Sequence, residues 1–138
     1  MKEVVLEAKT ENLDQLLEVM DQELKRLGCP PKKMKQVKIA IEEVFINICS
    51  YAYDSEVGKV IVRIESDEES AVISVQFVDE GKPFNPLENS EPDFTKPFEE
   101  RDVGGLGIFM VKKYMDEVTY EYRDNQNILS MKKKISLE

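Results

Sequence analysis

The strongest constraint on the fold of this chain is a break in its helical pattern near residue 30. Gly28 is followed closely by Pro30 and Pro31, and a helix cannot run through this pair because proline lacks the backbone N–H and clashes with the preceding turn. On both sides of the break, apolar residues recur at helical spacing. The sequence therefore predicts two consecutive helices, one from about residue 12 to the glycine and one from 31 to 53. The predicted apolar faces are Leu13, Leu16, Leu17, Met20, Leu24 and Leu27 on the first helix, and Val37, Ile41, Val44, Ile48 and Ala52 on the second.

Short segments with alternating apolar residues surround these helices and predict a sheet. A third helix is expected to open at Gly104 and to include the stretch IFMVKKYMDEV. Hairpin strands with helices between them are typical of an α+β two-layer sandwich, here with a mixed, mostly antiparallel sheet and the helices on one face. No repeat or composition shift divides the chain, so residues 1–138 are predicted to form one domain. The expected strands cover residues 2–8, 59–65, 71–78, about 117–123 and 127–135, with turns at Asp67–Ser70 and Asp124–Gln126.

Residues 84–103 interrupt this regular pattern. The segment has no sustained apolar period and contains Pro86, Pro92 and Pro97. An irregular loop of about 20 residues is uncommon inside a compact domain, and such loops often close over a ligand. We therefore expect residues 84–103 to form a lid.

Composition excludes several classes of function. The net charge of −9 gives a surface that repels nucleic-acid phosphates. The absence of histidine excludes Ser-His and Cys-His catalytic devices, and Cys29 and Cys49 alone cannot complete a tetrahedral metal site. No segment approaches the roughly 20 apolar residues of a membrane span, and the acidic N-terminal stretch is unlike a signal peptide. We therefore expect a cytoplasmic protein with reduced cysteines that binds neither nucleic acid nor membrane.

The second predicted helix carries a polar stripe as well as an apolar one. Glu43 and Asn47 are four residues apart and share a helix face, which Ser50 extends. Asparagine is a poor helix-interior residue, so its position calls for a reason. Its amide oxygen can bind Mg²⁺, and the carboxylate one turn earlier can polarise a nucleophile. The alternative is an ordinary solvated face with Asn47 at the edge of the core.

Asp79 and Gly81 follow the valine-rich strand predicted at 71–78. A carboxylate at a strand end can face a pocket and accept a hydrogen bond from an adenine amino group. The glycine lets the backbone pass close to a flat ring, because it has no Cβ. The alternative is a simple turn, which aspartate and glycine also favour.

The glycine-rich stretch Gly104–Gly107 precedes the third predicted helix. Glycines at a helix start let backbone N–H groups turn toward an anion at the positive end of the helix. An acidic protein can hold a triphosphate in this way. The stretch lacks the Gly-Lys-Ser/Thr of a Walker A loop and the third glycine of the dinucleotide fingerprint. The alternative is a flexible junction between loop and helix.

Taken in order, these segments resemble the GHKL ATPases, the superfamily of gyrase and the histidine kinases. The resemblance runs from about residue 10 to 135 and joins a helix with E-x-x-x-N, a strand ending in D-x-G, a polar lid and G-x-G opening a helix. The small size and the stretch GGLGIFMVKKYMDEV are most similar to the bacterial anti-sigma-factor serine kinases. The resemblance implies a Bergerat fold that binds ATP and Mg²⁺.

The resemblance also implies roles for individual residues. Asn47 matches the position that ligates Mg²⁺, and Glu43 matches the general base. Asp79 matches the residue that reads adenine, and Gly81 the one that shapes the pocket. The stretch Gly105-Leu106-Gly107 matches the segment that wraps the phosphates.

Three positions depart from the family pattern. Pro83 stands where the D-x-G-x-G motif has its second glycine, and Ile48 and Tyr51 stand where many members have alanine and histidine. A tyrosine can still donate a hydrogen bond to a phosphate. Tyr51 and Pro83 are therefore expected at the ATP site.

The resemblance implies an enzyme with protein partners. Its acceptor would be a serine on a small antagonist protein, a sigma factor would bind when the antagonist is absent, and the kinase would be a homodimer. Two alternatives remain open: a GHKL module that binds ATP and sequesters a partner without transfer, and an α+β interaction domain with no nucleotide. Glu43 favours the enzyme, because a pure binding module needs no base there.

Overall fold

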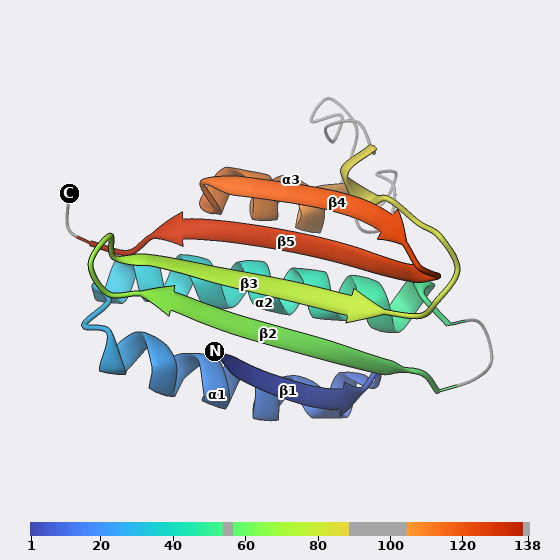
Figure 1. Ribbon diagram of the computed structural model, residues 1–138, viewed down its shortest axis with the longest axis horizontal. Coiled ribbons are helices and arrows are strands. Elements are labelled where there is room, and N and C mark those ends of the chain that lie inside the picture. The colour runs from blue at the N-terminus through green and yellow to red at the C-terminus, as the bar shows by residue number, and fades with distance from the viewer. Residues whose placement is uncertain (54–56, 89–104, 137–138) are drawn as a thin grey trace.

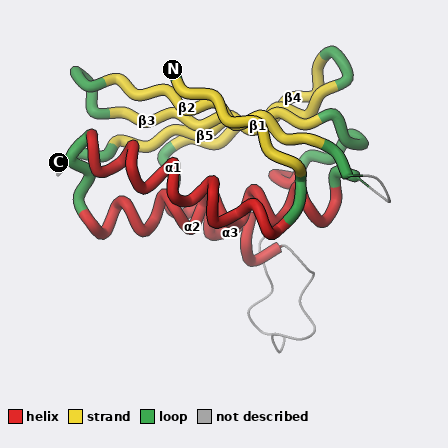
Figure 2. The backbone as a smooth tube through the Cα atoms, turned by 90° about the horizontal axis from the view of Figure 1, so that it is seen from below, coloured by secondary structure: helices red, strands yellow, loops and turns green. Residues whose placement is uncertain are grey.

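The structure is a computed structural model that describes residues 1–53, 57–88 and 105–136. Within these residues, a five-stranded sheet forms one layer and three α-helices form a second layer on one face of it (Figures 1 and 2). This arrangement confirms the expected α+β sandwich with helices on one face. The elements are β1 (Lys2–Glu7), α1 (Leu13–Arg26), α2 (Pro31–Tyr51), β2 (Lys59–Asp67), β3 (Val72–Asp79), α3 (Gly105–Tyr114), β4 (Glu117–Arg123) and β5 (Gln126–Lys134), with 3-10 helices η1 (Thr10–Asn12) and η2 (Pro86–Glu88).

The strand order is β1-β2-β3-β5-β4, and every neighbouring pair of the described strands is antiparallel. The expectation of a mixed sheet was therefore wrong. Two helices, not one, connect β1 to β2, so the chain runs back along α1, returns along α2 and enters β2 in the opposite direction to β1 (Figure 1). A single crossover helix connects β3 to β4, but β5 lies between these two strands, so they do not pair.

The break near residue 30 separates α1 from α2 as predicted. Gly28 has a φ of 71°, a conformation that favours glycine, and the Cys29 N–H donates to the carbonyl of Leu24 (3.0 Å). Pro30 is extended, with a ψ of 145°, and Pro31 occupies the first helical position, where its missing N–H costs no hydrogen bond. The two helices can therefore turn back on each other and pack side by side.

The third helix is shorter than predicted, because α3 ends at Tyr114 rather than at the end of the IFMVKKYMDEV stretch. After Tyr114 the backbone forms hydrogen bonds to β5 instead of continuing the hydrogen bonds of the helix. The Asp116 N–H donates to the carbonyl of Lys132 (2.9 Å), and Oδ2 of Asp116 accepts from the Lys134 N–H (2.7 Å). The buried ammonium of Lys133 also donates a hydrogen bond to the carbonyl of Tyr114. This carbonyl is one of those at the end of α3 that have no partner within the helix.

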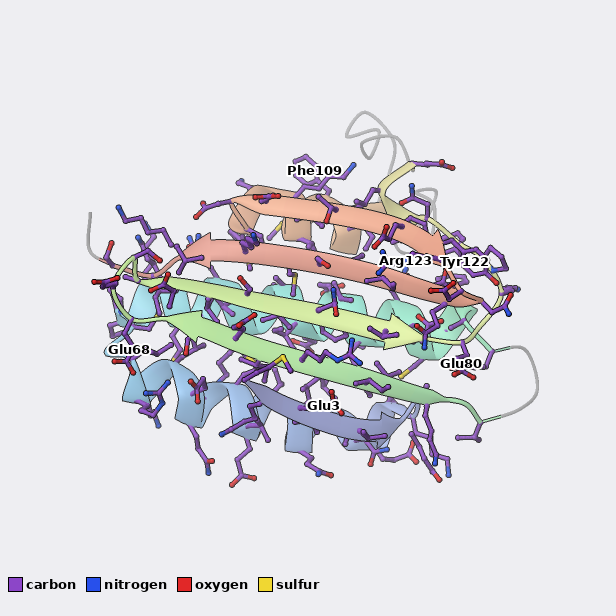
Figure 3. The ribbon with its side chains drawn as sticks, in the orientation of Figure 1. Glu3, Glu68, Glu80, Phe109, Tyr122 and Arg123 are labelled. Carbon is purple, nitrogen blue, oxygen red and sulfur yellow. The ribbon has the colours of Figure 1, made fainter. Side chains whose placement is uncertain are left out.

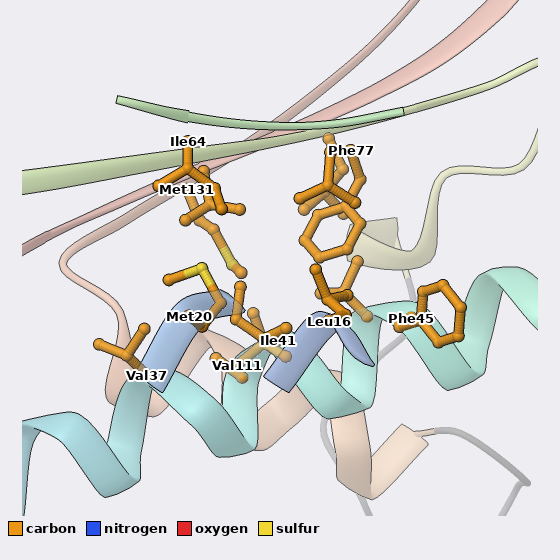
Figure 4. Packing of buried hydrophobic residues seen from close by; sticks show 14 of the residues in the cluster. Leu16, Met20, Val37, Ile41, Phe45, Ile64, Phe77, Val111 and Met131 are labelled. Carbon is orange, nitrogen blue, oxygen red and sulfur yellow. The ribbon is translucent and has the colours of Figure 1, made fainter. Parts of the chain in front are cut away.

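The hydrophobic core lies between the sheet and the helices (Figure 4). The inward residues of β2 alternate with exposed or half-buried ones, as period-2 patterning predicts. Burying one such large side chain contributes about 1.5–3 kcal/mol, so this layer holds the helices in fixed positions over the sheet. The largest fully buried side chains include Leu16 and Met20 of α1, Ile41 and Phe45 of α2, Ile64 of β2, Phe77 of β3 and Met131 of β5.

The other face of the sheet carries a row of polar side chains across four strands. Arg63 donates to Glu3 (3.0 Å) and to Gln76 (3.3 Å), and Gln76 donates to Ser130 (3.2 Å). Figure 3 shows Glu3 on β1 at this side of the molecule. The described part of the chain has no helix long and apolar enough to cross a membrane.

Candidate functional site

A pocket lies where the C-terminal half of α2 meets the end of β3 and the start of β5. Glu80, Tyr122 and Arg123 mark this end of the sheet in Figure 3. The pocket encloses about 420 Å³ of space, with its open mouth included. Its polar lining residues are Asn47, Tyr51, Asp79, Lys82, Tyr120 and Asn127, and its apolar ones are Val44, Ile48, Ala52, Phe77, Phe84, Pro86, Ile108 and Leu129.

Asp79 is the buried carboxylate of this pocket, with 5% of its surface exposed. Its Oδ1 accepts hydrogen bonds from the Gly81 N–H (2.9 Å) and from Nδ2 of Asn127 (2.9 Å). Within the described residues no donor contacts Oδ2, so this oxygen is left for a ligand. Burial raises the pKa of Asp79 above its ordinary value, and the two hydrogen bonds oppose that rise. The site therefore presents one acceptor oxygen in a largely apolar pocket.

Asn127 holds this carboxylate in place, and the sequence interpretation missed it. It faces Asp79 across the β3–β5 ladder and is 6% exposed. Its Nδ2 also donates to the carbonyl of Lys82 (3.0 Å), and its Oδ1 accepts from the Phe84 N–H (3.2 Å) and from the Tyr120 hydroxyl. One amide thus connects the buried acid to the start of the segment expected to form the lid. Asparagine is unfavourable in a strand, and that was the one available signal.

Asn47 lines the same pocket from α2. The described residues offer its side-chain amide no hydrogen bond, so its oxygen is available to a ligand. Mg²⁺ usually takes one or two protein oxygens and completes its shell with phosphates and water, and a single amide oxygen fits that pattern. No group of three or more His, Cys, Asp or Glu side chains among the described residues forms a metal cluster. Asn47 alone would leave most of the coordination positions of Mg²⁺ to water or to a ligand.

Aromatic side chains form one wall of the pocket. The ring of Tyr51, in the last turn of α2, stacks on that of Phe84 with a centroid separation of 5.6 Å and an interplanar angle of 29°. Both residues line the pocket. Stacked aromatic rings provide a flat, apolar surface, which suits a purine base.

Gly81 has a structural role that the sequence interpretation did not include. A Cβ at this position would lie 2.2 Å from the backbone oxygen of Ala52. The same oxygen accepts a hydrogen bond from the Lys82 N–H (2.9 Å). Gly81 is therefore required because the end of α2 passes against the turn that follows β3.

We expect Gly81→Ala to lower the free energy of unfolding by about 1–3 kcal/mol, because the clash involves a backbone atom that cannot rotate away. Urea unfolding followed by circular dichroism measures this change. Glu80→Ala, one residue earlier and exposed, is the control and should leave stability nearly unchanged. Equal stability of Gly81→Ala and the wild type would contradict the close approach of this turn to α2.

Glu43 lies one turn before Asn47 on α2 and faces α3. A Cβ on Gly107 would lie 2.3 Å from Oε2 of Glu43, so the glycine lets α3 approach this carboxylate. Within the described residues the carboxylate forms no hydrogen bond or ion pair. Burial raises the pKa of Glu43 above its ordinary value, and the negative charge of Glu42 raises it further. Glu43 is not itself among the residues that line the pocket, but its neighbour Val44 is, and a carboxylate with a raised pKa beside a pocket suits a general base.

The remaining expected site residues lie at the edge of the described structure or beyond it. Gly105 and Leu106 form the first turn of α3. Pro83 is exposed and does not line the pocket, whereas Pro86 does. Of the predicted lid, residues 89–103 lie outside the described residues, as does Gly104. Lys112 donates to the carbonyl of Leu87 (3.0 Å), which holds the first part of the lid segment against α3.

The sequence of residues 6–133 matches the family described as histidine kinase-like ATPase domains. Two curated relatives are serine-protein kinases named RsbW. The one from Bacillus mycoides is 28% identical over 111 residues, and the one from Bacillus cereus is 28% identical over 109 residues. Each alignment covers 78% of this chain and 68% of the relative.

Solved structures show the same fold at lower identity. The RsbU and RsbW domains of a Mycobacterium tuberculosis protein superpose with a TM-score of 0.70 at 12% identity, covering all of this chain and 34% of that one. The catalytic domain of the histidine kinase ThkA superposes over the full length of both chains with a TM-score of 0.57 at 13% identity. These likenesses establish the fold of the chain around the pocket.

Proposed function

The chain belongs to the family of histidine kinase-like ATPase domains, and from this premise we propose that it binds ATP with Mg²⁺ in the pocket between α2, β3 and β5. The observation that carries this proposal is the geometry of Asp79. Its Oδ1 accepts two hydrogen bonds, and no described residue donates a hydrogen bond to its Oδ2; Asp79 itself lines the pocket. A fixed, buried acceptor beside an aromatic wall suits the 6-amino group of adenine.

The same geometry favours adenine over guanine. The 6-amino group donates a hydrogen bond to a carboxylate, whereas the 6-oxo group of guanine would place an acceptor against it. Leaving buried polar groups unpaired is costly, so a mismatch of this kind discriminates strongly. Asp79 would therefore select the base, and Tyr51 and Phe84 would contribute apolar contact area.

Asn47 would bind Mg²⁺ through its amide oxygen. The bound ion would supply neutralisation of the phosphate charge. The N-terminal turn of α3, which begins at Gly105, would direct backbone N–H groups toward the phosphates. These contributions explain how a chain with a net charge of −9 would hold a triphosphate.

We further propose transfer of the terminal phosphoryl group to a serine of a partner protein, with Glu43 as the base. The serine oxygen forms a bond to the γ-phosphorus, the bond from that phosphorus to the β–γ bridging oxygen breaks, and the serine proton moves to the carboxylate. The raised pKa of Glu43 supports this role, because a base with a higher pKa takes up a proton more readily. The name of the curated relatives, serine-protein kinase, supports serine as the acceptor.

The proposal extends to the partners of the anti-sigma-factor system. The acceptor would be a small antagonist protein, a sigma factor would bind in its absence, and the kinase would act as a homodimer. The likeness to the RsbW relatives supports this assignment. An ATP-binding module that sequesters its partner without transfer remains the alternative, and a variant of Glu43 separates the two.

The test of the proposed site is calorimetric titration of ATP with and without Mg²⁺. We expect Mg²⁺ to strengthen the binding of ATP to the wild type. We expect Asn47→Ala to bind ATP weakly whether or not Mg²⁺ is present, because the variant lacks the proposed metal ligand. Gln36→Ala, which removes another side-chain amide from α2, is the matched control and should bind as the wild type does. Tight Mg-ATP binding by Asn47→Ala would remove Asn47 from the site, and no binding by the wild type would refute the proposed function.

A further inference from the structure

A groove between α1 and α2 is distinct from the nucleotide pocket. It encloses about 850 Å³ with its open mouth included, about twice the space of the nucleotide pocket by the same measure. Three half-buried apolar side chains, Leu17, Met34 and Ile39, contribute to its lining. The helices α1 and α2 run side by side (Figure 2), and the lining residues extend from Leu17 to Lys25 on α1 and from Pro31 to Glu42 on α2, so the groove follows both helices. Its shape and apolar lining suit a segment of another protein rather than a small polar ligand.

The charge around this groove is opposite to that of the rest of the chain. Residues 24–41 contain six lysines and arginines and no acid, whereas the rest of the sequence contains 13 basic and 28 acidic residues. Three of these lysines, Lys25, Lys35 and Lys38, line the groove, and one acid, Glu42, lines its end. An acidic protein therefore presents three lysines together beside an apolar surface.

Internal ion pairs leave part of this positive charge unbalanced. Lys25 and Lys38 both contact Asp21, at 2.8 and 3.0 Å, so that one carboxylate balances two ammonium groups. Lys35 is exposed and forms no ion pair with any described residue. With Glu42 included, the three lysines of the groove face two carboxylates, so the groove keeps a net positive charge that an acidic partner would complement.

We propose that this groove docks a helical segment of a partner protein, one with an apolar face flanked by carboxylates. Such a helix would place its apolar face on Leu17, Met34 and Ile39 and its carboxylates near Lys35 and the shared lysines. A nucleic acid would not use the apolar lining, and the charge complementarity therefore favours an acidic peptide.

The position of the groove gives this docking a role. It ends at Glu42, and the next residue on α2 is Glu43, the proposed base. Glu43 faces α3, on the other side of α2 from the groove, so a partner held along the groove would present its acceptor serine on a separate segment that crosses α2, at a raised effective concentration. This role rests on the proposed function, whereas docking in the groove does not.

The probe for this proposal is a fluorescein-labelled helical peptide of about 18 residues, roughly five turns. It is alanine-based, with leucines at i, i+3, i+4 and i+7 spacing and glutamates on both flanks, and a second peptide has lysine in place of every glutamate. Fluorescence anisotropy measures affinity, and amide chemical shifts of the labelled protein locate the site. We expect the acidic peptide to bind, to shift the amides of Met34, Lys35 and Ile39, and to bind more weakly as salt rises.

Two charge reversals test the groove directly. Lys35→Glu should weaken binding of the acidic peptide about tenfold, because it places like charges together. Lys113→Glu makes the same change at an exposed position of α3 and should leave the affinity unchanged. Circular dichroism of the same samples shows whether each variant is folded, and calorimetry with ATP shows whether the nucleotide site is intact.

Several outcomes would overturn the proposal. These are shifts confined to other surfaces, equal affinity for the two peptides, or equal weakening by the two charge reversals. Binding of phosphatidylglycerol vesicles that depends on Lys35, without binding of the acidic peptide, would assign the groove to a membrane instead. Peptide binding in a protein that fails to bind ATP would refute the proposed nucleotide function and leave the groove standing.

Discussion

Replacement of Asp79 by asparagine is expected to reduce ATP affinity about 100-fold, which corresponds to roughly 2.7 kcal/mol, while leaving the fold as stable as the wild type. An asparagine retains the Oδ1 acceptor for the Gly81 N–H and for Nδ2 of Asn127. In place of Oδ2 it presents an NH₂ group, which would face the adenine amino group donor to donor. A charge-assisted hydrogen bond is lost, and a polar group is left unpaired.

Ionisation of Asp79 is expected to lower the free energy of unfolding, whereas ionisation of an aspartate in a salt bridge raises it. Burial raises the pKa of Asp79 above the value in the unfolded chain, so the folded state disfavours the ionised form. At pH values above the raised pKa this carboxylate therefore weakens the fold, and stability is regained as the pH falls through that pKa. A neutral asparagine avoids the penalty, so the free energy of unfolding at pH 7 should be equal to or above that of the wild type.

Calorimetry with ATP and urea unfolding at pH 7 check these two expectations on the same samples. Asp67→Asn is the matched control, because Asp67 lies at the far end of the β2–β3 hairpin, where it accepts hydrogen bonds from the turn. That variant should bind ATP as the wild type does. If Asp79→Asn unfolds, Asp79 has a structural role, and if it binds ATP normally, Asp79 does not read adenine. For the wild type, ATP affinity should fall as the pH drops through the raised pKa of Asp79.

The parts of the structure that local sequence signals control were predictable. Gly28 and the two prolines determine where one helix ends and the next begins, because each acts on its own backbone. The spacing of Glu43 and Asn47 likewise places them on one side of α2 without knowledge of the rest of the fold. Apolar alternation identified the strands for the same reason.

The missed features depend on contacts between distant segments. Asn127 reaches Asp79 across 48 positions of sequence, through the register of β3 against β5. The predicted strand 127–135 included Asn127, but no local pattern says which residue of β3 it faces. The turn itself is one residue shorter than predicted: Asp124 and Asn125 have positive φ, and Gln126 already pairs with Arg123. The end of α3 at Tyr114 is also set by sheet pairing, which outweighs the helical pattern of the next residues.

Glu43→Gln is the second variant with a large expected effect: phosphoryl transfer should slow by about 10²–10⁴-fold with ATP affinity unchanged. A glutamine has nearly the same shape and keeps the contact with α3, but it cannot accept the proton of the attacking hydroxyl. Equilibrium titration of Mg-ATP measures binding. The release of inorganic phosphate measures transfer, with water in the place of the serine hydroxyl.

The matched control for this variant is Glu42→Gln, one residue away on the same helix. The charge of Glu42 raises the pKa of Glu43, after the larger effect of burial. Removing that charge should lower the pKa of the base and move the acid limb of the kcat profile to lower pH, while the rate at neutral pH changes little. In the wild type this limb should lie above the ordinary pKa of glutamate, since only the ionised carboxylate can take up the proton.

A Glu43→Gln enzyme that releases phosphate at the wild-type rate would remove Glu43 from the mechanism. Wild-type ATP binding without any phosphate release, in contrast, would show that water does not replace the serine hydroxyl, and the comparison of Glu43→Gln with the wild type would then need a serine-bearing acceptor.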